Sequence, residues 1–452
     1  MGLNEKQSEF VNYVLQNYKS NGMVLLNAPA GTGKTFLSKY IIKEISKNKG
    51  KVKIIAPTNK AVNVLMKHEI YASTIHRFLN AVSNFKDNGK IYFEFTCPFI
   101  VNHIIIVDEC SMITKEMFKK FKSLSTNNYL IFMGDDLQLP PIDKEEFDEN
   151  YVKTKISKLS PVFNITPKFT LTKNMRSLEI TSNLYLEKAR ESVHKKQMPS
   201  VLYETSIKNM LKKFDEDEDT IIVSFSNGSV NNYNRLVREH KFKKTGDDLE
   251  KYYKGEVLFF SNGMRKVGDD KYYSGDKIKI QVLETEYLDI EYVMCRHPKV
   301  ENKNKCITCN KKILPPERMN FYKITDQYNN IWYKPIDLYK FSKVKKDYKN
   351  YAIQCKSSNT RREYYDWLNC YDAELKYSYS MTIHKSQGSE FRNVFVDRNN
   401  LIRSTSQDLL LKLHGYYTAI SRMITFVSDI KKYKKNTKKY QKIPHFLIFN
   451  DF

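Results

Sequence analysis

Short apolar runs alternate with amphipathic segments over the first 135 residues of this 452-residue chain. Unbroken runs of Val, Ile and Leu predict buried strands, and polar–apolar spacing of the helical kind predicts helices between them. The expected strands are 23–28, 52–57, 103–108 and 129–135, with helices at 35–47 and 59–68. Strands that are apolar along their whole length are typical of a parallel sheet covered on both faces. We therefore predict an α/β domain over residues 1–160.

The alternation stops at residues 80–100. The stretch KDNGKIYFEF has a turn sequence, Asp87, Asn88 and Gly89, between two runs that suit strands. Such a turn predicts a hairpin inserted in the first domain.

A second α/β pattern comes next in the chain, and it is interrupted. Strands are expected at 220–227 and 393–397, and helices at 230–240 and 408–421. Between them, residues 253–375 form glycine-punctuated, tyrosine-rich runs that suit β structure, such as DKIKIQVLE at 276–284. We predict a second α/β domain made of 161–252 and 376–452, with 253–375 as a β-rich insertion. The basic stretch 431–442 is expected to be a solvated face or loop.

The charge of the chain is strongly positive, with 75 Lys and Arg against 51 Asp and Glu and a net charge of +24. A surplus of this size favours a polyanionic partner, either nucleic acid or an acidic membrane face, although an AT-rich coding sequence would also enrich Lys, Asn and Tyr. The seven scattered cysteines argue against a secreted disulfide framework. No apolar run is long enough to cross a bilayer, and the first residues do not resemble a signal peptide. We expect a soluble intracellular protein that does not bind membranes.

The stretch APAGTGKT at 28–35 fits a phosphate-binding loop between a strand and a helix, with Ala28 where the commonest form has glycine. Glycines let the backbone curl so that its N–H groups face phosphate oxygens at the helix N-terminus. Lys34 would reach the β- and γ-phosphates, and the Thr35 hydroxyl would bind Mg²⁺. The candidate nucleotide ligands are Ala30, Gly31, Thr32, Gly33, Lys34 and Thr35.

Two later strand ends supply the other groups that ATP hydrolysis needs. In HIIIVDECS, Asp108 would hold Mg²⁺ and Glu109 would polarise the attacking water. In MGDDLQLPPI, Asp135 comes after a strand end and Gln138 could hydrogen-bond to a γ-phosphate or its water. A simple structural turn would explain this last stretch equally well.

With these stretches in order, the chain resembles a superfamily 1 helicase, and further motifs match from residue 3 to residue 423. They are LNEKQ, APTNKAV, STIHRFL, LTKNMRS and YYTAISRM. The resemblance implies two RecA-like domains and a role for each matched residue. Gln7 would recognise adenine, Thr58, Asn59 and His76 would contact DNA, and Arg176 and Arg422 would reach the γ-phosphate.

The stretch TIHKSQGSEF resembles the RecD/Dda branch, whose members move 5′ to 3′ on single strands. The other branch carries an alanine–lysine–glycine run where this chain has Ser386, Gln387 and Gly388. The resemblance implies that Thr382, His384 and Lys385 contact DNA, while Gly388 and Glu390 face the nucleotide. It also implies an SH3-like barrel in the insertion and an aromatic wedge, such as Phe85, on the hairpin.

These assignments divide the ATP site between two halves, so that ATP would favour a closed cleft and hydrolysis would reopen it. If each half also binds the DNA strand, one cycle of cleft closing and opening would move the protein one step along that strand. The expected ligands are ATP, Mg²⁺, single-stranded DNA and duplex junctions, and we expect a monomer that serves replication or repair. The repeated T-I-H at 74–76 and 382–384 favours DNA contact by His76 over a packed core imidazole.

Three alternatives stay open. The stretch 295–309 places Cys295, His297, Cys306 and Cys309 at spacings that suit a structural zinc, although the Cys-x-His spacing is unusual. The hairpin aromatics would either stack on a base or only pack the hairpin. The chain would otherwise be an RNA-directed or RNA–protein remodelling ATPase, or an accessory nucleic-acid-binding factor with a vestigial ATP site.

Overall fold

The computed structural model describes residues 2–85, 91–141, 159–173, 175, 180–198, 206–261, 264–267, 270–273, 275–290, 317–354, 358–404, 408–423 and 446–449. The chain divides into two compact units. The α/β unit comprises 1–82, 93–244 and 379–452, and the inserted unit comprises 83–92 and 245–378. Among the described residues, no helix has the length and apolar character that a membrane span requires.

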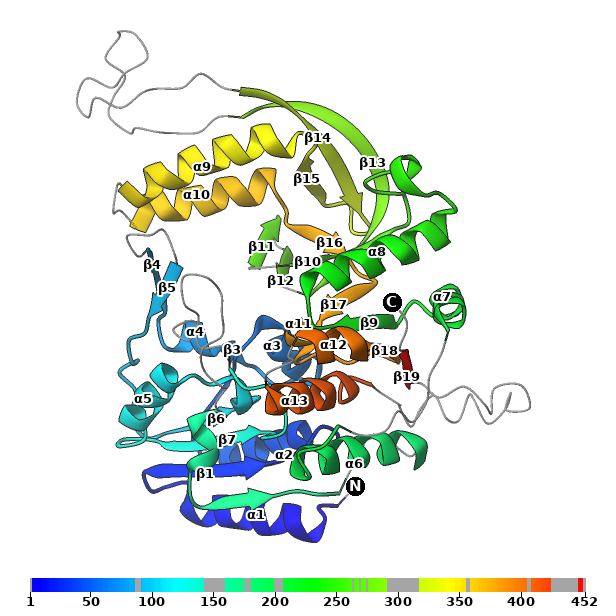
Figure 1. Cartoon of the computed structure of the whole chain (residues 1–452). Coiled ribbons are helices and arrows are strands. Elements are labelled where there is room, and N and C mark those ends of the chain that lie inside the picture. Colours follow the sequence, from blue (N-terminus) through cyan, green and yellow to red (C-terminus); the bar gives the residue numbers. More distant parts are fainter. Residues whose placement is uncertain are drawn as a thin grey trace, which may run out of the picture. The chain divides into compact units, whose positions relative to one another are not determined.

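The first sheet of the α/β unit has six parallel strands in the order β3-β2-β6-β7-β1-β8 (Figure 1). Their bounds are β1 Gly22–Asn27, β2 Lys51–Ala56, β3 Ser73–Thr74, β6 His103–Val107, β7 Tyr129–Gly134 and β8 Lys168–Thr170. The four strands that the apolar runs predicted are therefore confirmed. The short β3 and β8 were not predicted.

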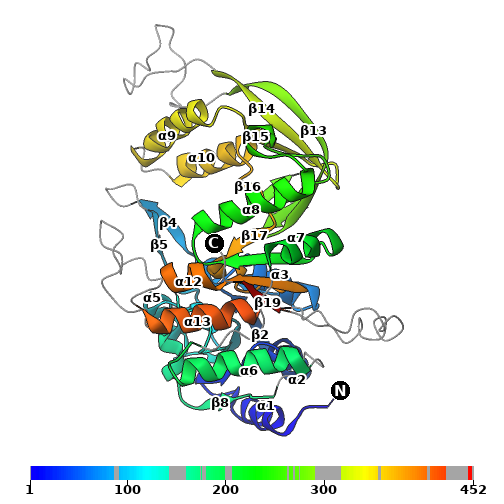
Figure 2. The same cartoon turned by 45° about the vertical axis from the view of Figure 1, so that its right-hand side comes forward.

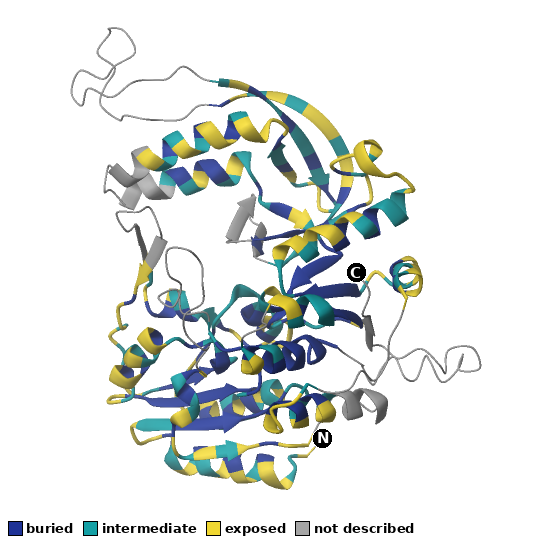
Figure 3. Cartoon of the chain, in the orientation of Figure 1, coloured by how far each residue is buried: buried dark blue, intermediate teal, exposed yellow. Residues whose placement is uncertain are grey.

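Helices cover both faces of this sheet because its strands are apolar on both sides. In β1, Val24 and Leu26 pack beneath one set of helices, while Leu25 packs on the opposite face. Burying one such side chain contributes about 1.5–3 kcal/mol. The first face carries α1 (Glu5–Asn17), α2 (Lys34–Lys47) and α3 (Asn59–Lys67), and the second carries α4 (Ile75–Phe78), α5 (Lys115–Leu124) and the 3₁₀ turn η3 (Pro161–Asn164). Figure 3 shows the strands largely buried between these layers.

The second sheet of the same unit is also parallel, in the order β17-β9-β18-β19. Its strands are β9 Thr220–Ser224, β17 Ser380–Thr382, β18 Asn393–Asp397 and β19 Phe446–Phe449. The helices around it are α6 Ile180–His194, α7 Ile207–Glu216, α8 Asn227–Phe242, α11 Ile383–Ser386, α12 Arg398–Ser404 and α13 Leu409–Ile420. Helices α6 and α13 lie side by side (Figure 2). The predicted fold class, α/β with two parallel sheets, is confirmed.

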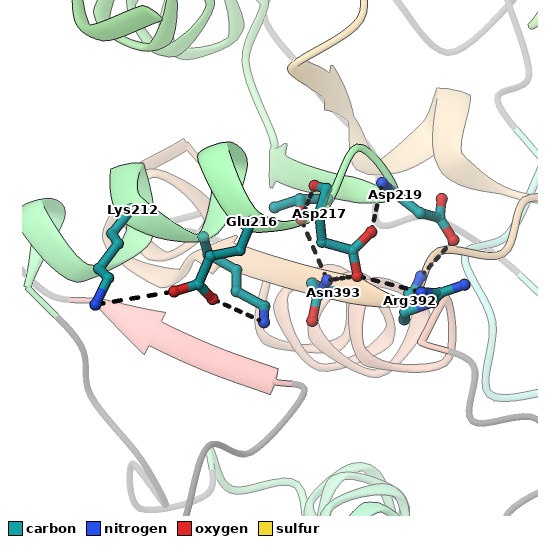
Figure 4. Close-up of polar contacts among 8 residues, drawn as sticks. Lys212, Glu216, Asp217, Asp219, Arg392 and Asn393 are labelled. Carbon is teal, nitrogen blue, oxygen red and sulfur yellow. Dashed lines mark hydrogen bonds and ion pairs between the residues drawn. The ribbon is translucent and has the colours of Figure 1, made fainter. Parts of the chain in front are cut away.

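Polar side chains fix the entry to β9 and β18 (Figure 4). Asn393 donates to Asp217 at 2.9 Å, and the Arg392 N–H donates to Asp219 at 3.0 Å. These contacts hold the amino ends of the two strands together. At the carboxyl ends of the same strands, the Asn400 side chain accepts from the Phe225 and Ser226 N–H groups, at 3.0 and 2.9 Å.

The inserted unit combines a five-stranded antiparallel sheet with two helices. The sheet order is β15-β14-β13-β10-β16, with β11 and β12 forming a separate pair. The strands are β10 Val257–Phe260, β11 Met264–Val267, β12 Asp270–Tyr273, β13 Lys277–Ile290, β14 Glu317–Asp326, β15 Ile331–Pro335 and β16 Leu375–Tyr377. The strands confirm that the insertion is β-rich, but an SH3-like barrel stays a prediction.

The expectation of β-like structure throughout this insertion is wrong at its C-terminal end. Two helices lie there, α9 (Leu338–Gln354) and α10 (Ser358–Tyr371). Phe341, Val344 and Tyr348 recur at helical spacing and pack against Trp367 and Phe321. Tyr residues, which also suit strands, stand among these positions and make the helical period of α9 less evident.

The predicted hairpin of the first domain is present as a two-stranded sheet of β4 (Val82–Phe85) and β5 (Ile91–Glu94). Its predicted turn, residues 87–89, lies outside the described residues. The side chain of Phe85 also lies outside them, so its role as a wedge stays a prediction.

Candidate functional site

The carboxyl ends of β1, β6 and β7 bring the first-half candidates together, because neighbouring parallel strands end at one edge of the sheet. The loop after β1 is fastened there by a hydrogen bond from the Ala28 N–H to the Gly134 carbonyl at 2.6 Å. Asp108 comes directly after β6, and its N–H donates to the Ile55 carbonyl at the end of β2. One edge therefore holds the phosphate loop and the acidic strand ends.

The phosphate loop presents the uncapped N-terminus of α2. Gly31 and Gly33 have φ angles of 80° and 93°, in the left-handed region that favours glycine. Gly33 is the N-cap and makes no side-chain cap hydrogen bond, so the first N–H groups of this 14-residue helix are available to an anion. The Lys34 ammonium donates to the Ala28 carbonyl at 2.8 Å, over the same loop. Ala30, Thr32 and Thr35 complete the predicted phosphate ligands at this edge.

Two carboxylates stand beside this loop. Burial and the charge of Glu109 raise the pKa of Asp108 to about 6, against a smaller lowering by Lys34. Glu109 adopts a left-handed φ of 50°, a conformation that costs free energy for a residue other than glycine. Its buried Oε2 has no hydrogen-bond partner among the described residues. The charge of Lys34 does not offset burial and the repulsion between the two carboxylates, so a bound cation would stabilise this site.

This donor set fits Mg²⁺, a hard cation that prefers carboxylate, hydroxyl and water oxygens. Asp108 and Thr35 would hold the ion. When bound, it would neutralise charge on the phosphates and so lower the barrier to phosphoryl transfer.

Gln138 lies after β7 in a buried loop. Its side chain is 2% exposed, and its Nε2 has no hydrogen-bond partner among the described residues. An unpaired buried amide costs free energy, so such groups mark sites where a partner is expected. A turn with only a structural role does not explain why this buried donor has no partner.

Gln7 is held at the start of α1 next to the phosphate loop. Its Oε1 accepts from the Asn4 N–H at 3.1 Å, and its Nε2 donates to the Thr32 carbonyl at 3.1 Å. A carboxamide has two donor hydrogens and two acceptor lone pairs. One N–H and one lone pair of Gln7 therefore remain for hydrogen bonds to a nucleotide base.

Of the two predicted arginines, the structure describes Arg422 but not Arg176. Arg422 lies just after α13 and is 3% exposed, with its guanidinium donating to the Ser421 hydroxyl at 2.8 Å and to the Thr418 carbonyl at 3.2 Å. Arg176 lies outside the described residues. The nearby Met175 N–H donates to the Gly31 carbonyl at 2.7 Å, so the chain reaches the phosphate loop just before Arg176.

The segment 380–391 lies against the first half of the α/β unit. Gly388 has a φ of 70°, and a Cβ placed on it would lie 3.7 Å from the Thr58 hydroxyl oxygen and 3.6 Å from Ala61. Lys60 sits over the Phe391 ring at 5.5 Å. Gly388 therefore lies beside Thr58, one of the first-half residues that were predicted to bind DNA, and Glu390 is partly buried.

Thr58 and Thr382 use their hydroxyl oxygens in the same way. Thr58 caps α3 by accepting from the Ala61 N–H at 3.1 Å, and Thr382 caps α11 by accepting from the Lys385 N–H at 3.3 Å. Each hydroxyl keeps its own hydrogen as a donor, which a phosphate oxygen could accept. Asn59 is the first residue of α3 and is partly buried, whereas the Lys385 side chain is exposed.

The two predicted DNA-contacting histidines each pack against an aromatic ring while staying partly exposed. The His76 ring lies 5.1 Å from Phe93 and 5.5 Å from Phe95, and the His384 ring lies 5.5 Å from Phe225. Packing and ligand contact are therefore compatible at both positions.

Ser226 and Asn227 are candidates that the sequence analysis missed. The stretch IVSFSNGSVN (222–231) repeats the pattern of IIAPTNKAVN (54–63), with Ser226 and Asn227 in place of Thr58 and Asn59. Ser226 caps α8 by accepting from the Ser229 N–H at 3.3 Å. The registers also correspond, because Ala56 pairs with Thr74 in the first sheet and Ser224 pairs with Thr382 in the second. The signal was a weak internal repeat of ten residues.

The predicted zinc ligands Cys295, His297, Cys306 and Cys309 lie outside the described residues. Within the part of the chain that the structure describes, no group of three or more His, Cys, Asp and Glu side chains could hold a metal ion.

Two family models match the chain, one described as an AAA domain over residues 2–195 and one as a UvrD-like helicase C-terminal domain over residues 377–422. The chain is 26% identical to the ATP-dependent DNA helicase dda of Enterobacteria phage T4, over 66% of this chain and 61% of that protein. It is 24% identical to the RecBCD enzyme subunit RecD of Buchnera aphidicola, over 93% of this chain and 72% of that protein. Among solved structures, Pif1 helicase from Bacteroides in complex with ADP-AlF3 and ssDNA matches with a TM-score of 0.46 and 15% identity, over 97% of this chain and 98% of that chain. The family models and relatives confirm the resemblance that the motifs predicted.

Proposed function

The chain belongs to the superfamily 1 helicases of the RecD/Dda branch, and on this premise we propose that it moves 5′ to 3′ along single-stranded DNA and separates duplexes. It is an ATP-dependent enzyme of this family, whereas the direction and the coupling of ATP to movement are the proposal. One observation carries it: Gly388 of the second half packs against the Thr58 cap of the first half. A change in the distance between the two halves would therefore alter the contacts of the residues that are expected to bind the DNA strand.

The chemistry depends on the positions of the first-half groups. Lys34 and the N-terminus of α2 would bind the β- and γ-phosphates, and Thr35 and Asp108 would hold Mg²⁺. Glu109 would take a proton from the attacking water, and Gln138 would orient that water or the γ-phosphate. Gln7 would select adenine through its remaining donor and acceptor.

Arg422 would supply positive charge from the second half, with Arg176 as a second source. An arginine delivered to the transferring phosphate is worth about 10³–10⁵ in rate. To reach it, Arg422 would exchange its bonds to Ser421 and Thr418 for the phosphate. ATP would then favour the closed arrangement of the halves, and hydrolysis would remove that preference.

The strand would be held by matching turns on the two sheets. Thr58, Asn59 and His76 would contact its backbone in the first half, and Thr382, His384 and Lys385 in the second, joined by Ser226 and Asn227. Hydroxyl groups, amides and helix N-termini are common partners of backbone phosphates. The same proposal includes Phe85 as a wedge and an SH3-like barrel in 253–375. It also includes two RecA-like domains, one of residues 1–160 and one of residues 161–252 and 376–452, and a monomer that serves replication or repair.

The direct test is ATP hydrolysis measured with and without single-stranded DNA, beside single-stranded RNA of the same sequence. We expect DNA to stimulate hydrolysis more than RNA, and Lys34→Ala to abolish the stimulated rate. Stronger stimulation by RNA would make the chain an RNA-directed ATPase. Stimulation by neither, with nucleic acid still bound, would favour an accessory factor.

A structural zinc held by Cys295, His297, Cys306 and Cys309 is a separate part of the proposal. Zinc equimolar with protein after dialysis would support it, and zinc-free folded protein would contradict it.

A further inference from the structure

Helix α13 holds the loop that carries Gln138, although the two are far apart in the sequence. The Thr418 hydroxyl accepts from the Leu139 N–H at 2.9 Å, and Tyr417 donates to the Asp135 carboxylate at 2.6 Å. Leu137 and Leu139 pack in the core of the second sheet rather than the first. The loop thus starts at the end of β7 and is anchored in the other half of the α/β unit.

His414 makes the contact nearest to Gln138. Its Nδ1 lies 2.9 Å from the Leu137 carbonyl oxygen and 3.2 Å from the Gln138 carbonyl oxygen. Carbonyl oxygens only accept, so these partners require Nδ1 to carry the proton and to donate to both. Burial lowers the pKa of His414, which is 5% exposed, so the imidazole is neutral near pH 7.

The main chain of Gln138 is therefore held from two sides, while its side-chain Nε2 is left unpaired. Its N–H donates to the Asp135 carbonyl at 3.2 Å, and its own carbonyl accepts from His414. Its Nε2 has no partner among the described residues. Restraining the backbone limits where the carboxamide can go, and so pre-organises it for a ligand.

We propose that His414 is a positioning residue that fixes the main chain at Leu137 and Gln138 and so sets the place of the Gln138 carboxamide. This rests on the proposed function, in which Gln138 acts at the γ-phosphate or its water. The same helix ends just before Ser421 and Arg422, so one rigid element would place both Gln138 and the arginine. None of the motifs from which the family was recognised gives His414 a role.

The first test needs no nucleotide, because it measures the loop itself. Amide hydrogen exchange at 137–139 is compared in the full-length wild type, His414→Leu and His414→Asn. Leucine keeps an apolar side chain but removes the donor, and we expect exchange to rise roughly 10-fold. Asparagine places an N–H₂ group where the ring has Nδ1, so it should restore exchange close to the wild-type rate.

The second test is a kinetic cycle with Gln138. His414→Leu should lower the DNA-stimulated kcat for ATP roughly 10-fold with little change in KM, within the loss of up to about 10² that misplaced groups cause. In a Gln138→Ala background, the same substitution should lower kcat little further. Ile420→Val is the matched control, since it lies in the same helix and core but makes no hydrogen bond to the loop in the described structure.

The outcomes separate the two proposals. Unchanged exchange at 137–139 in His414→Leu would overturn the positioning role, whether or not the protein hydrolyses ATP. An equal loss of kcat in both backgrounds, no rescue by asparagine, or the same loss in Ile420→Val would overturn it too. If the wild type shows no nucleic-acid-stimulated hydrolysis, the proposed function fails, and exchange alone then decides whether His414 holds the loop.

Discussion

The two parallel sheets of the α/β unit carry the same pair of turns but differ in the acidic groups at the ends of their other strands. In each sheet a hydroxyl residue lies two positions after a strand and caps a helix: Thr58 after β2 and Ser226 after β9. The neighbouring strand ends in a threonine that caps a short helix: Thr74 for α4 and Thr382 for α11. Asp108 after β6 accepts one N–H, from Glu109, and stands beside an unpaired carboxylate oxygen. Asp397 at the end of β18 accepts the Asn400 N–H at 2.9 Å. Burial raises the pKa of Asp397 as well, although this hydrogen bond and the charge of Arg403 lower it.

The difference agrees with the proposal that both sheets hold nucleic acid and that only the first sheet binds the nucleotide. At Asp397 the carboxylate serves the start of α12, so the end of that strand is a structural cap. At Asp108 the neighbouring groups are arranged at a cost in stability, which a bound cation would offset. We therefore expect changes on the first sheet to affect chemistry, and matched changes on the second to affect folding or the grip on DNA.

The largest expected effect is on hydrolysis. Glu109→Gln should lower the DNA-stimulated kcat by about 10²–10⁴, the usual contribution of a general base. Asp397→Asn is the matched control on the second sheet, and its kcat should stay close to the wild-type value. Equal losses in the two variants would show that the strand ends are not distinct in function.

Asp108→Asn should remove Mg²⁺-dependent hydrolysis and yet raise the thermal stability of the free protein. The folded pKa of Asp108, about 6, lies above its usual value of 3.8. Ionisation therefore opposes folding increasingly between these two pH values and fully above pH 6. The gain should be on the order of 1–3 kcal/mol at pH 7, and it should shrink as the pH falls from 7 to 4, where the wild-type carboxyl is protonated. Unfolding curves measured without Mg²⁺ at several pH values test this. A variant that is less stable than wild type at pH 7 would contradict it.

Thr58→Ala and Ser226→Ala test whether the two turns are equivalent. Each removes a hydroxyl donor and a helix cap, so binding of single-stranded DNA should weaken by about 1 kcal/mol in either variant, or roughly fivefold. Thr58→Ser and Ser226→Thr keep the hydroxyl and should bind like the wild type. Fluorescence anisotropy with a labelled strand measures the affinities. If only one of the two alanine variants lost affinity for DNA, the turns of the two sheets would not be equivalent.

The smallest effect is expected at two glycines. Gly388→Ala forces a side chain into a φ of 70° close to Thr58, and should cost about 1 kcal/mol of stability. Gly228→Ala lies in α8 with nothing within 4 Å of the added Cβ, and should instead stabilise by about 0.5–1 kcal/mol. Thermal unfolding of both variants gives the comparison. Stabilisation by Gly388→Ala would show that this turn is not constrained.

The sequence predicted those features that depend on local pattern. Apolar runs located β1, β2, β6 and β7, and the motifs assigned Lys34, Asp108, Glu109 and Gln138 to one ATP site. Helices α9 and α10 were not predicted because both contain several Tyr residues, which also suit strands. The contact between His414 and Leu137 joins residues 277 positions apart, and no local period encodes such a pair. Ser226 and Asn227 could have been found from the ten-residue repeat.

Movement along one strand in one direction is tested most directly by unwinding of tailed duplexes with ATP and Mg²⁺. One duplex carries a single-stranded 5′ tail and the other a 3′ tail of the same sequence, with Lys34→Ala as the inactive control. We predict that the wild type separates the duplex with the 5′ tail and leaves the one with only a 3′ tail intact. Separation of the 3′-tailed duplex alone, or of both at equal rates, would contradict 5′-to-3′ movement.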